Sequence, residues 1–215
     1  MKGDKIILES FHLEIASHII DRLVNNITEH DRYCISVAGE SGSGKSVTGY
    51  ALKEALNNKG IKTEVIQQDD YFFLPPKTNE MSRRMSLENV GPHEVNLALI
   101  DTHVKQFLEG ENFITKPLVI FFENRATTET LDLTGVKVLI IEGTYTSLLQ
   151  NVNARVFINR DWNSRIQSIK TRARDVVDDF LEQVLTIEHR IISQHQQYAD
   201  IVIGEGVDVQ FIGQH

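Results

Sequence analysis

The sequence predicts a three-layer α/β fold in which helices cover both faces of a mostly parallel, five-stranded sheet. The first observation is a set of five short apolar runs with little polar alternation, which is typical of strands buried on both faces. The second is that helical patterns alternate with these runs, an order that favours parallel strands. The third is a glycine-rich loop between the first run and the helix that follows it. The five expected strands are residues 33–38, 62–67, 136–142, 155–159 and 200–203.

Helices are predicted where apolar residues recur every three or four positions. One such pattern covers residues 11–27, before the first strand. A second covers residues 47–56 and stops at the polar, glycine-ending residues 57–60. A third places Leu97, Ile100, Val104, Phe107 and Leu108 on one face. A fourth covers most of residues 162–197, with an apolar stripe through Phe180, Val184, Ile187 and Ile191.

The stretch between the second and third expected strands is less regular. Residues 71–89 contain two adjacent prolines and several polar residues, so an irregular connection is expected there. Residues 117–122 predict an additional strand, and residues 123–135 are polar and predict a loop. Insertions after the carboxyl ends of parallel strands are where substrates bind in open α/β sheets.

Composition sets the broad class of the protein. The chain has 215 residues, of which 41% are hydrophobic and 24% charged, values typical of one folded domain. The net charge of −8 argues against nucleic-acid partners, because sequence-independent binding uses many Lys and Arg residues on phosphates. The single cysteine, Cys34, excludes an internal disulfide and fits a reducing compartment. Without a signal-peptide pattern or a run of about 18 apolar residues, we expect a cytoplasmic protein with no membrane partner.

The glycine-rich loop carries the strongest functional signal. Residues 39–46 read Gly-Glu-Ser-Gly-Ser-Gly-Lys-Ser, a full match to the P-loop pattern, and they lie between a predicted strand and a predicted helix. Glycines let successive backbone N–H groups point inward, and the helix N-terminus adds positive potential, so the loop can hold phosphates. The expected nucleotide-binding residues are Gly39, Glu40, Ser41, Gly42, Ser43, Gly44, Lys45, Ser46 and Val47.

Other signatures narrow the class of P-loop protein. Guanine-specific proteins need an Asn-Lys-x-Asp element, whereas Asn58-Lys59 is followed here by Gly60-Ile61. The glycine-rich signature of transport ATPases is absent from the sequence, and the chain is too short for a pair of helicase domains. These observations favour a kinase that acts on a small molecule, with ATP and Mg²⁺ as cofactors.

Two acidic residues at predicted strand ends are candidates for phosphoryl transfer. Asp69 follows the second strand, where a carboxylate can orient or deprotonate an acceptor hydroxyl. The alternative for Asp69 is a turn or a helix N-cap, a role that suits Asp70 better. Glu142 ends an apolar strand, where an unpaired acid would be costly without a cation or donors. Ser46, Asp69 and Glu142 are therefore the expected magnesium-associated residues.

A basic segment interrupts the acidic chain. Arginines held over the transferring phosphoryl group would stabilise its charge and exclude water, as a mobile lid does. The alternative is a solvated helix face, and the sequence leaves open whether Arg160 and Arg165 belong to the lid. The segment contains Arg160, Arg165, Lys170, Arg172 and Arg174.

Together these motifs resemble those of the uridine kinase and phosphoribulokinase family of P-loop kinases. Besides the P-loop, they are Gln68-Asp-Asp-Tyr-Phe72, Ile141-Glu-Gly143, Arg172-Ala-Arg-Asp175 and Tyr198-Ala-Asp-Ile-Val-Ile203. The resemblance spans about residues 33–203. It implies ATP as phosphoryl donor, Asp69 as base and magnesium-associated carboxylate, Glu142 as a second acid on the metal, and Arg172 and Arg174 in the lid. With Lys45 of the P-loop, which would reach the β- and γ-phosphates, the expected catalytic residues are Lys45, Asp69, Arg172 and Arg174.

The acceptor segment departs from the uridine kinase pattern. Val119, Ile120 and Asn124 stand where Tyr, Asp and His contact a nucleoside, and Val90-Gly91-Pro92 replaces Asp-His-Pro. Loss of groups that hydrogen-bond a substrate changes specificity strongly, so a remodelled acceptor pocket is expected. Two adjacent arginines would suit an acidic or phosphorylated acceptor. The candidate acceptor-binding residues are Arg83, Arg84, Asn89, His93 and Arg125.

The sequence thus predicts a kinase that transfers the γ-phosphoryl group of ATP to a hydroxyl group of a small metabolite. Two alternatives stay open: an authentic uridine or cytidine kinase, and a nucleotide-binding regulatory module without phosphotransfer. We expect residues 1–215 to form a single P-loop kinase domain. Its parts would be an N-terminal helical extension (1–32), an acceptor-side insertion (71–135) and a helical lid (160–175). The sequence leaves the oligomeric state open, including a homo-oligomer.

Overall fold

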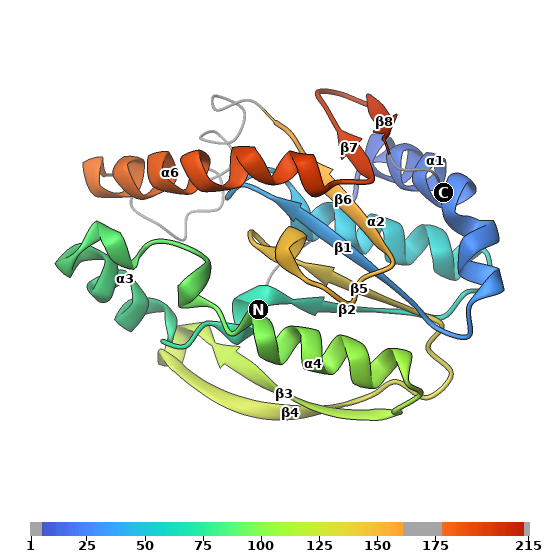
Figure 1. Cartoon of the computed structure of the whole chain (residues 1–215), viewed down its shortest axis with the longest axis horizontal. Helices are drawn as coiled ribbons and strands as arrows, with labels where there is room; N and C mark the ends of the chain where they lie inside the picture. Colours follow the sequence, from blue (N-terminus) through green and yellow to red (C-terminus); the bar gives the residue numbers. More distant parts are fainter. Residues whose placement is uncertain (1–5, 161–177, 213–215) are drawn as a thin grey trace.

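The computed structural model describes residues 6–160 and 178–212, and its centre is a six-stranded sheet in the order β2-β5-β1-β6-β7-β8 (Figure 1). The first five strands are parallel to one another, and β8 runs antiparallel to β7. The mostly parallel sheet is therefore confirmed, and its five parallel strands fall on the five expected runs. The sixth strand, β8, was not expected from the sequence. The strands are β1 (Tyr33–Gly39), β2 (Thr63–Gln67), β5 (Val138–Glu142), β6 (Ala154–Ile158), β7 (Ile201–Ile203) and β8 (Val209–Phe211).

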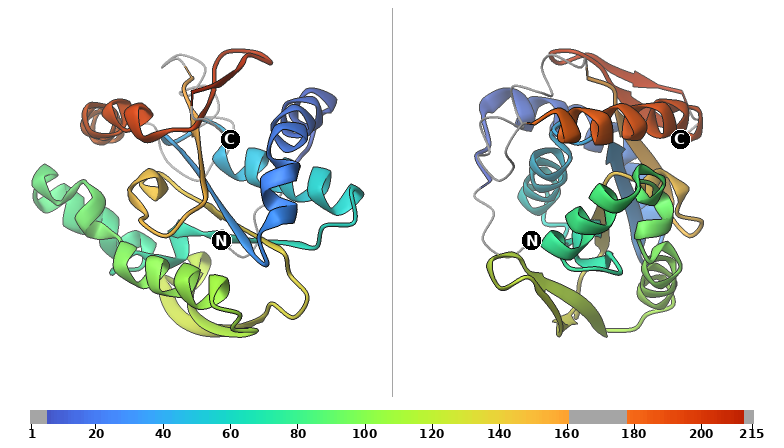
Figure 2. Two further views of the ribbon diagram at one scale, coloured as in Figure 1. Left: turned by 45° about the vertical axis from the view of Figure 1, so that its right-hand side comes forward. Right: turned by 90° about the vertical axis from the view of Figure 1, so that its left-hand side faces the viewer.

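Two helices cover one face of this sheet. α1 (Ser10–Glu29) and α2 (Lys45–Asn58) pack against each other and against inward-facing residues of β1, β5 and β6. Their buried residues follow the three- and four-residue spacing seen in the sequence, as in Ala16, Ile19 and Leu23 of α1. Figure 2 shows the sheet between this pair and the helices of the other side.

The other face of the sheet is covered by α4 (Leu97–Leu108) and by the end of α6 (Asp179–Ile192). Ile100, Val104 and Phe107 of α4 pack there with alternate residues of the central strands, among them Cys34 of β1. Cys34 has no exposed surface, and burial raises the pKa of its thiol. Because consecutive residues of β1 face opposite layers, the strand is buried along its whole length.

The stretch expected to be irregular contains a helix. α3 (Pro76–Met85) has Pro76 at its first position and Pro75 as its N-cap, and a 3₁₀ turn (Leu87–Asn89) follows it. Proline lacks a backbone N–H and has a fixed φ, so it disrupts a helix interior but suits the first turn. The two prolines thus begin a helix, and the expected irregular connection over residues 71–89 is wrong in this part.

The expected polar loop after residue 122 is wrong as well. Phe113–Ile120 (β3) pairs with Arg125–Asp132 (β4) in an antiparallel hairpin beside α4 (Figure 1). β4 has a largely exposed, threonine-rich sequence, so its apolar pattern is weak although threonine favours strands. Its backbone groups are satisfied by β3, and this pairing across a short turn makes the segment a strand.

The predicted lid falls almost wholly outside the described residues. Arg165, Lys170, Arg172 and Arg174 lie in residues 161–177. The described part of the expected fourth helix consists of α6 and a 3₁₀ turn (Ser193–Tyr198). Among the helices of residues 6–160 and 178–212, none is both long and apolar enough to span a bilayer.

Candidate active site

The P-loop connects β1 to α2 at the carboxyl edge of the sheet. Gly42 and Gly44 have φ values of 79° and 98°, a left-handed conformation that favours glycine. Gly39 is needed because of close packing: a Cβ there would lie 2.9 Å from the Ile158 carbonyl oxygen. Lys45 Nζ donates to the Glu40 carbonyl oxygen at 3.0 Å, which holds the lysine along the loop. The chain therefore forms the strand, loop and helix that the motif requires.

Glu142 meets the P-loop across the β1–β5 pair. Its register opposite Val37 places it beside the start of α2, where Ser46 Oγ donates to Glu142 Oε1 at 2.9 Å. The Glu142 residue is 5% exposed. Burial and then the negative charge of Asp69 raise the pKa of Glu142, while Lys45 and the Ser46 hydrogen bond act in the opposite direction. A carboxylate held in this way would gain from a nearby cation.

The two aspartates after β2 have different surroundings. Asp69 is exposed on the 3₁₀ turn Gln68–Tyr71 and lines the cavity described below. Asp70 is buried: its carboxylate accepts from Lys116 Nζ at 2.6 Å and from the Val119 backbone N–H at 2.9 Å. The capping role expected for Asp70 is wrong, since Gln67 is the N-cap of this turn. Asp70 instead attaches the turn to the β3–β4 hairpin.

A large cavity of about 520 Å³ lies between the P-loop, α3 and α6. Lys45, Ser46, Asp69 and Glu142 line its sheet side. A second cavity of about 190 Å³, here named the small cavity, adjoins it. Both are lined by Ser41, Asp69, Pro76, Asn79, Arg83, Thr144 and Glu188, and the small cavity also by Phe72, Leu74 and Tyr145. Lys45, Ser46 and Asp69, which the sequence assigned to nucleotide, metal and catalysis, thus face residues of the predicted insertion across one cavity.

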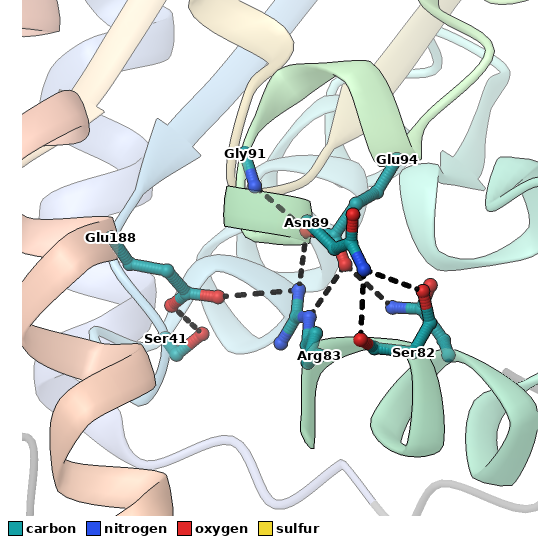
Figure 3. A network of polar contacts seen from close by, with 8 residues as sticks. Ser41, Ser82, Arg83, Asn89, Gly91, Glu94 and Glu188 are labelled. Carbon is teal, nitrogen blue, oxygen red and sulfur yellow. Dashed lines mark hydrogen bonds and ion pairs between the residues drawn. The ribbon is translucent and has the colours of Figure 1, made fainter. Parts of the chain in front are cut away.

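Arg83 and Arg84, two of the candidate acceptor residues, both reach the large cavity from α3. Arg83 forms a two-point contact with Glu94, with Nε–Oε1 and Nη2–Oε2 distances of 2.6 and 2.9 Å. Its Nη2 also lies 3.6 Å from Glu188 Oε1, and Figure 3 shows Arg83 between the two carboxylates. Arg84 pairs with Glu80 and Asp178 and lies over the Phe180 ring. Both arginines are therefore engaged by neighbouring acids.

The other three candidate acceptor residues are placed elsewhere, and none of them lines either cavity. Asn89 Nδ2 donates to the Ser82 carbonyl oxygen at 2.8 Å and so fastens the end of α3 (Figure 3). His93 belongs to the 3₁₀ turn Pro92–Glu94. Arg125 is exposed at the start of β4 and pairs with Glu123 at 2.6 Å. The structure brings together Arg83 and Arg84 only.

Glu188 is a residue that sequence reasoning missed. It accepts from Ser41 Oγ at 2.8 Å and so joins α6 to the P-loop, beside a contact between His189 Nδ1 and Glu40 Oε1 at 3.0 Å. Glu188 falls four residues from both Val184 and Ile192 on the buried stripe of α6. A carboxylate at a core-facing position of an amphipathic helix was the signal that could have identified it.

The groups near Ser46 and Glu142 fit a magnesium ion. They offer hydroxyl and carboxylate oxygens, which Mg²⁺ prefers, and Mg²⁺ is commonly held by one or two carboxylates together with substrate phosphates and water. In residues 6–160 and 178–212, no three His, Cys, Asp or Glu side chains gather into a metal-binding group.

Comparisons with known proteins identify the family. The profile of the phosphoribulokinase/uridine kinase family matches residues 34–211. A uridine kinase from Clostridium novyi (strain NT) is 28% identical over 186 residues, covering 80% of this chain and 86% of that protein.

Solved structures share the fold at low sequence identity. The D-glycerate 3-kinase of Cryptococcus neoformans is 14% identical with a TM-score of 0.64, covering 95% of this chain and 100% of the other. The phosphoribulokinase of Rhodobacter spheroides is 14% identical with a TM-score of 0.62, covering 81% and 70%. With the family profile spanning the sheet, the P-loop and both acidic strand ends, this chain belongs to the phosphoribulokinase/uridine kinase family of kinases.

Proposed function

We propose that this chain transfers the γ-phosphoryl group of ATP to a hydroxyl group of a small-molecule acceptor. The observation that carries the proposal is a cavity of about 520 Å³ that is lined both by P-loop residues and by residues of the insertion. Lys45 and Ser46 line it from the P-loop, and α3 lines it from the insertion. Phosphoryl transfer depends mainly on positioning two substrates in line and on stabilising charge, which such a shared cavity permits.

The residues on the sheet side have distinct proposed roles. Ser46, Glu142 and Asp69 would hold Mg²⁺, which when bound neutralises oxygens of the transferring phosphates. Lys45 and the P-loop N–H groups would orient the β- and γ-phosphates. Asp69, the exposed carboxylate in the cavity, would accept the proton of the acceptor hydroxyl on a carboxylate oxygen as that hydroxyl attacks. Arg172 and Arg174 remain proposed lid residues.

A remodelled acceptor pocket is part of the proposal. Val119 is 1% exposed, and its backbone N–H is held by Asp70. The Asn124 side chain fastens the start of α3 by accepting from the Lys77 backbone N–H at 2.8 Å. Neither these two residues nor Ile120 line the described cavities. Two of the positions expected to contact a nucleoside in uridine kinases, Val119 and Asn124, are thus engaged within the protein, which supports a changed acceptor.

Two variants test the catalytic assignment. We expect Lys45→Ala to lose binding of a non-hydrolysable ATP analogue with Mg²⁺, measured by calorimetry. Asp69→Asn should weaken that binding far less than Lys45→Ala does, because Ser46, Glu142 and the P-loop remain, while kcat for acceptor-dependent ADP release falls by about 10²–10⁴, the usual contribution of a general base. Asp31→Asn is the matched control, because Asp31 is exposed before β1, at the opposite end of that strand from the P-loop.

Wild-type behaviour separates the kinase from the regulatory alternative. An acceptor panel of nucleosides, sugars and sugar phosphates should contain at least one compound that stimulates ADP release. Tight nucleotide binding without such stimulation would contradict the kinase proposal and favour a regulatory module. Unchanged turnover in Asp69→Asn would contradict the roles proposed for Asp69 and leave the kinase proposal itself standing.

A further inference from the structure

The small cavity offers an acceptor both apolar and hydrogen-bonding surface. Phe72, Leu74 and Pro76 form its apolar part. Tyr145 lines it too, and the buried Tyr145 hydroxyl has no hydrogen-bond partner among residues 6–160 and 178–212. A buried hydroxyl without a partner is costly, so a ligand hydroxyl that reaches it would gain a bond. The volume of about 190 Å³ is below the ~300–1,000 Å³ of drug-sized ligand pockets and favours a compact acceptor.

Arg83, the basic residue that lines the small cavity, has its charge balanced on the protein. Burial acts to lower the pKa of Arg83, but the hydrogen bonds that Arg83 donates to Glu94 and the negative charge of Glu188 outweigh burial and raise that pKa. Glu94 is itself saturated, because Asn79 Nδ2 and the Gly91 backbone N–H also donate to it at 2.9 and 2.8 Å. This network fixes the guanidinium in place (Figure 3).

Among residues 6–160 and 178–212, the other charged side chains that line the small cavity are negative. Asp69 and Glu188 line it together with Arg83, so two carboxylates face one guanidinium that a third carboxylate, Glu94, already binds. The Glu188 side chain is 6% exposed, and a charge of that kind is poorly screened by solvent. An anionic acceptor group placed here would meet uncompensated repulsion, which is a recognised means of excluding wrong substrates.

An uncharged hydroxyl group meets no such penalty. A guanidinium has five N–H donors, so Arg83 can hydrogen-bond a neutral ligand while its charge stays balanced by Glu94 and Glu188. Asp69 and Glu188 can accept from ligand hydroxyls. The lining of the small cavity therefore suits a ligand with several hydroxyl groups and disfavours a phosphate or a carboxylate group.

We propose that the small cavity binds a compact, uncharged acceptor with several hydroxyl groups, and that Glu94 and Glu188 determine this specificity. Glu94 keeps Arg83 from binding an anion, and Glu188 repels one. This inference rests on the proposed kinase function. It replaces the sequence-based expectation that the two arginines select an acidic or phosphorylated acceptor.

Matched acceptor pairs test the inference. Suitable pairs are D-fructose with D-fructose 6-phosphate, D-ribulose with its 5-phosphate, and glycerol with D-glycerate, because each anionic member keeps a free hydroxyl. ADP release is measured for every compound with saturating Mg²⁺ and ATP. We expect at least one neutral member to be turned over, with kcat/KM at least ~100-fold above that of its anionic partner. Equal or better use of the anionic member would overturn the proposal and point to basic residues of the predicted lid as acceptor ligands.

Variants then locate the source of selectivity. Glu188→Gln keeps an oxygen for the Ser41 hydroxyl but removes the negative charge, so the neutral-to-anionic ratio should fall at least ~10-fold. Glu182→Gln is the matched control on the exposed side of α6 and should leave the ratio unchanged. A ratio that stays unchanged in Glu188→Gln would show that this carboxylate does not set specificity.

A binding measurement decides the question if none of these pairs is turned over. Inorganic phosphate is titrated into protein saturated with Mg²⁺ and the non-hydrolysable ATP analogue, which occupies the P-loop. We expect no phosphate binding tighter than about 1 mM, and binding tighter than that would overturn the proposal. Failure of the analogue itself to bind would instead contradict the proposed kinase function, so the two failures are distinguishable.

Discussion

At the residue scale, Glu142 illustrates how a binding site can be costly to the free protein. It is 5% exposed, and its ionised form is opposed by burial and by Asp69. The sequence identified this residue correctly as an acid at the end of an apolar strand, because the run before it predicts burial. It could not identify the bond from Ser46, which depends on the register between β1 and β5.

We predict that Glu142→Gln stabilises the free protein and weakens its response to Mg²⁺. The folded-state pKa of Glu142 is raised above the usual 4.5, so its contribution to stability is lost as pH rises through that raised pKa. At pH 8 the variant should therefore gain about 1 kcal/mol in the free energy of unfolding, measured in urea without ligands. The gain should shrink as the pH falls and vanish well below pH 4.5, where the wild-type carboxyl is protonated in both states.

The affinity for the Mg²⁺-loaded ATP analogue should change in the opposite sense: ionised Glu142 destabilises the free protein but favours binding. Binding of the Mg²⁺-loaded ATP analogue needs ionised Glu142, so wild-type affinity should increase with pH, whereas Glu142→Gln should bind weakly at every pH. Calorimetry at pH 5 and pH 8 measures both. Equal affinity of the two proteins for the Mg²⁺-loaded analogue would contradict a role of Glu142 at the metal.

At the element scale, the β3–β4 hairpin is held to the turn that carries Asp69 by a buried ion pair. Lys116 and Asp70 have side chains that are 4% and 5% exposed, and Lys116 also contacts Glu129 at 2.9 Å. Sequence patterns gave no sign of this pair, because its members are 46 residues apart and each looks like an ordinary polar residue. Only the tertiary packing of the hairpin against the turn brings Lys116 and Asp70 together.

We predict that Lys116→Met destabilises the protein by about 3–5 kcal/mol, because it leaves Asp70 buried without its cation. The double variant Asp70→Asn/Lys116→Met should recover part of the loss, since no unpaired charge remains. Urea denaturation measures each free energy. Lys105→Met is the matched control, because the Lys105 side chain is 64% exposed and should change stability by no more than about 0.5 kcal/mol.

Two elements show where sequence patterns fail and why. The prolines before α3 and the threonines of β4 are each compatible with loops, and only their tertiary surroundings select a helix and a strand. By contrast, α1, α2 and the five parallel strands have apolar patterns that match their burial closely. The spacing of apolar residues predicts the helices and strands that form the core. It predicts surface elements such as α3 and β4 poorly, because few of their residues are buried.

At the scale of the whole molecule, the P-loop motif allowed the site's position to be predicted because parallel strands end at one edge. Gly39, Gln67 and Glu142 end neighbouring strands, so the loop, Asp69 and Glu142 had to meet there. The acceptor side could not be predicted in the same way. Its residues come from α3, the Pro92–Glu94 turn and α6, and only the folded chain brings Arg83, Glu94 and Glu188 together.

We predict that the Mg²⁺-loaded ATP analogue raises the thermal midpoint of the whole protein. At a free concentration of 100 times Kd, binding to the folded state adds about 2.7 kcal/mol. For a chain of this size that corresponds to a shift of about 5–10 °C, measured by scanning calorimetry. Lys45→Ala should shift by less than about 1 °C under the same conditions, and an equal shift in both proteins would contradict binding at the P-loop.

The burial of Cys34 in the central strand makes the sulfur a kinetic reporter of the fold. Its thiol can react with an alkylating reagent only after the sheet opens, since the side chain has no exposed surface and burial raises its pKa. When reclosing is faster than alkylation, the labelling rate measures the population of the open state. If that opening is global, the Mg²⁺-loaded ATP analogue should slow labelling by the factor 1 + [L]/Kd. A labelling rate that does not change when the nucleotide analogue is added would show that the reagent reaches Cys34 through a local opening that leaves the P-loop intact.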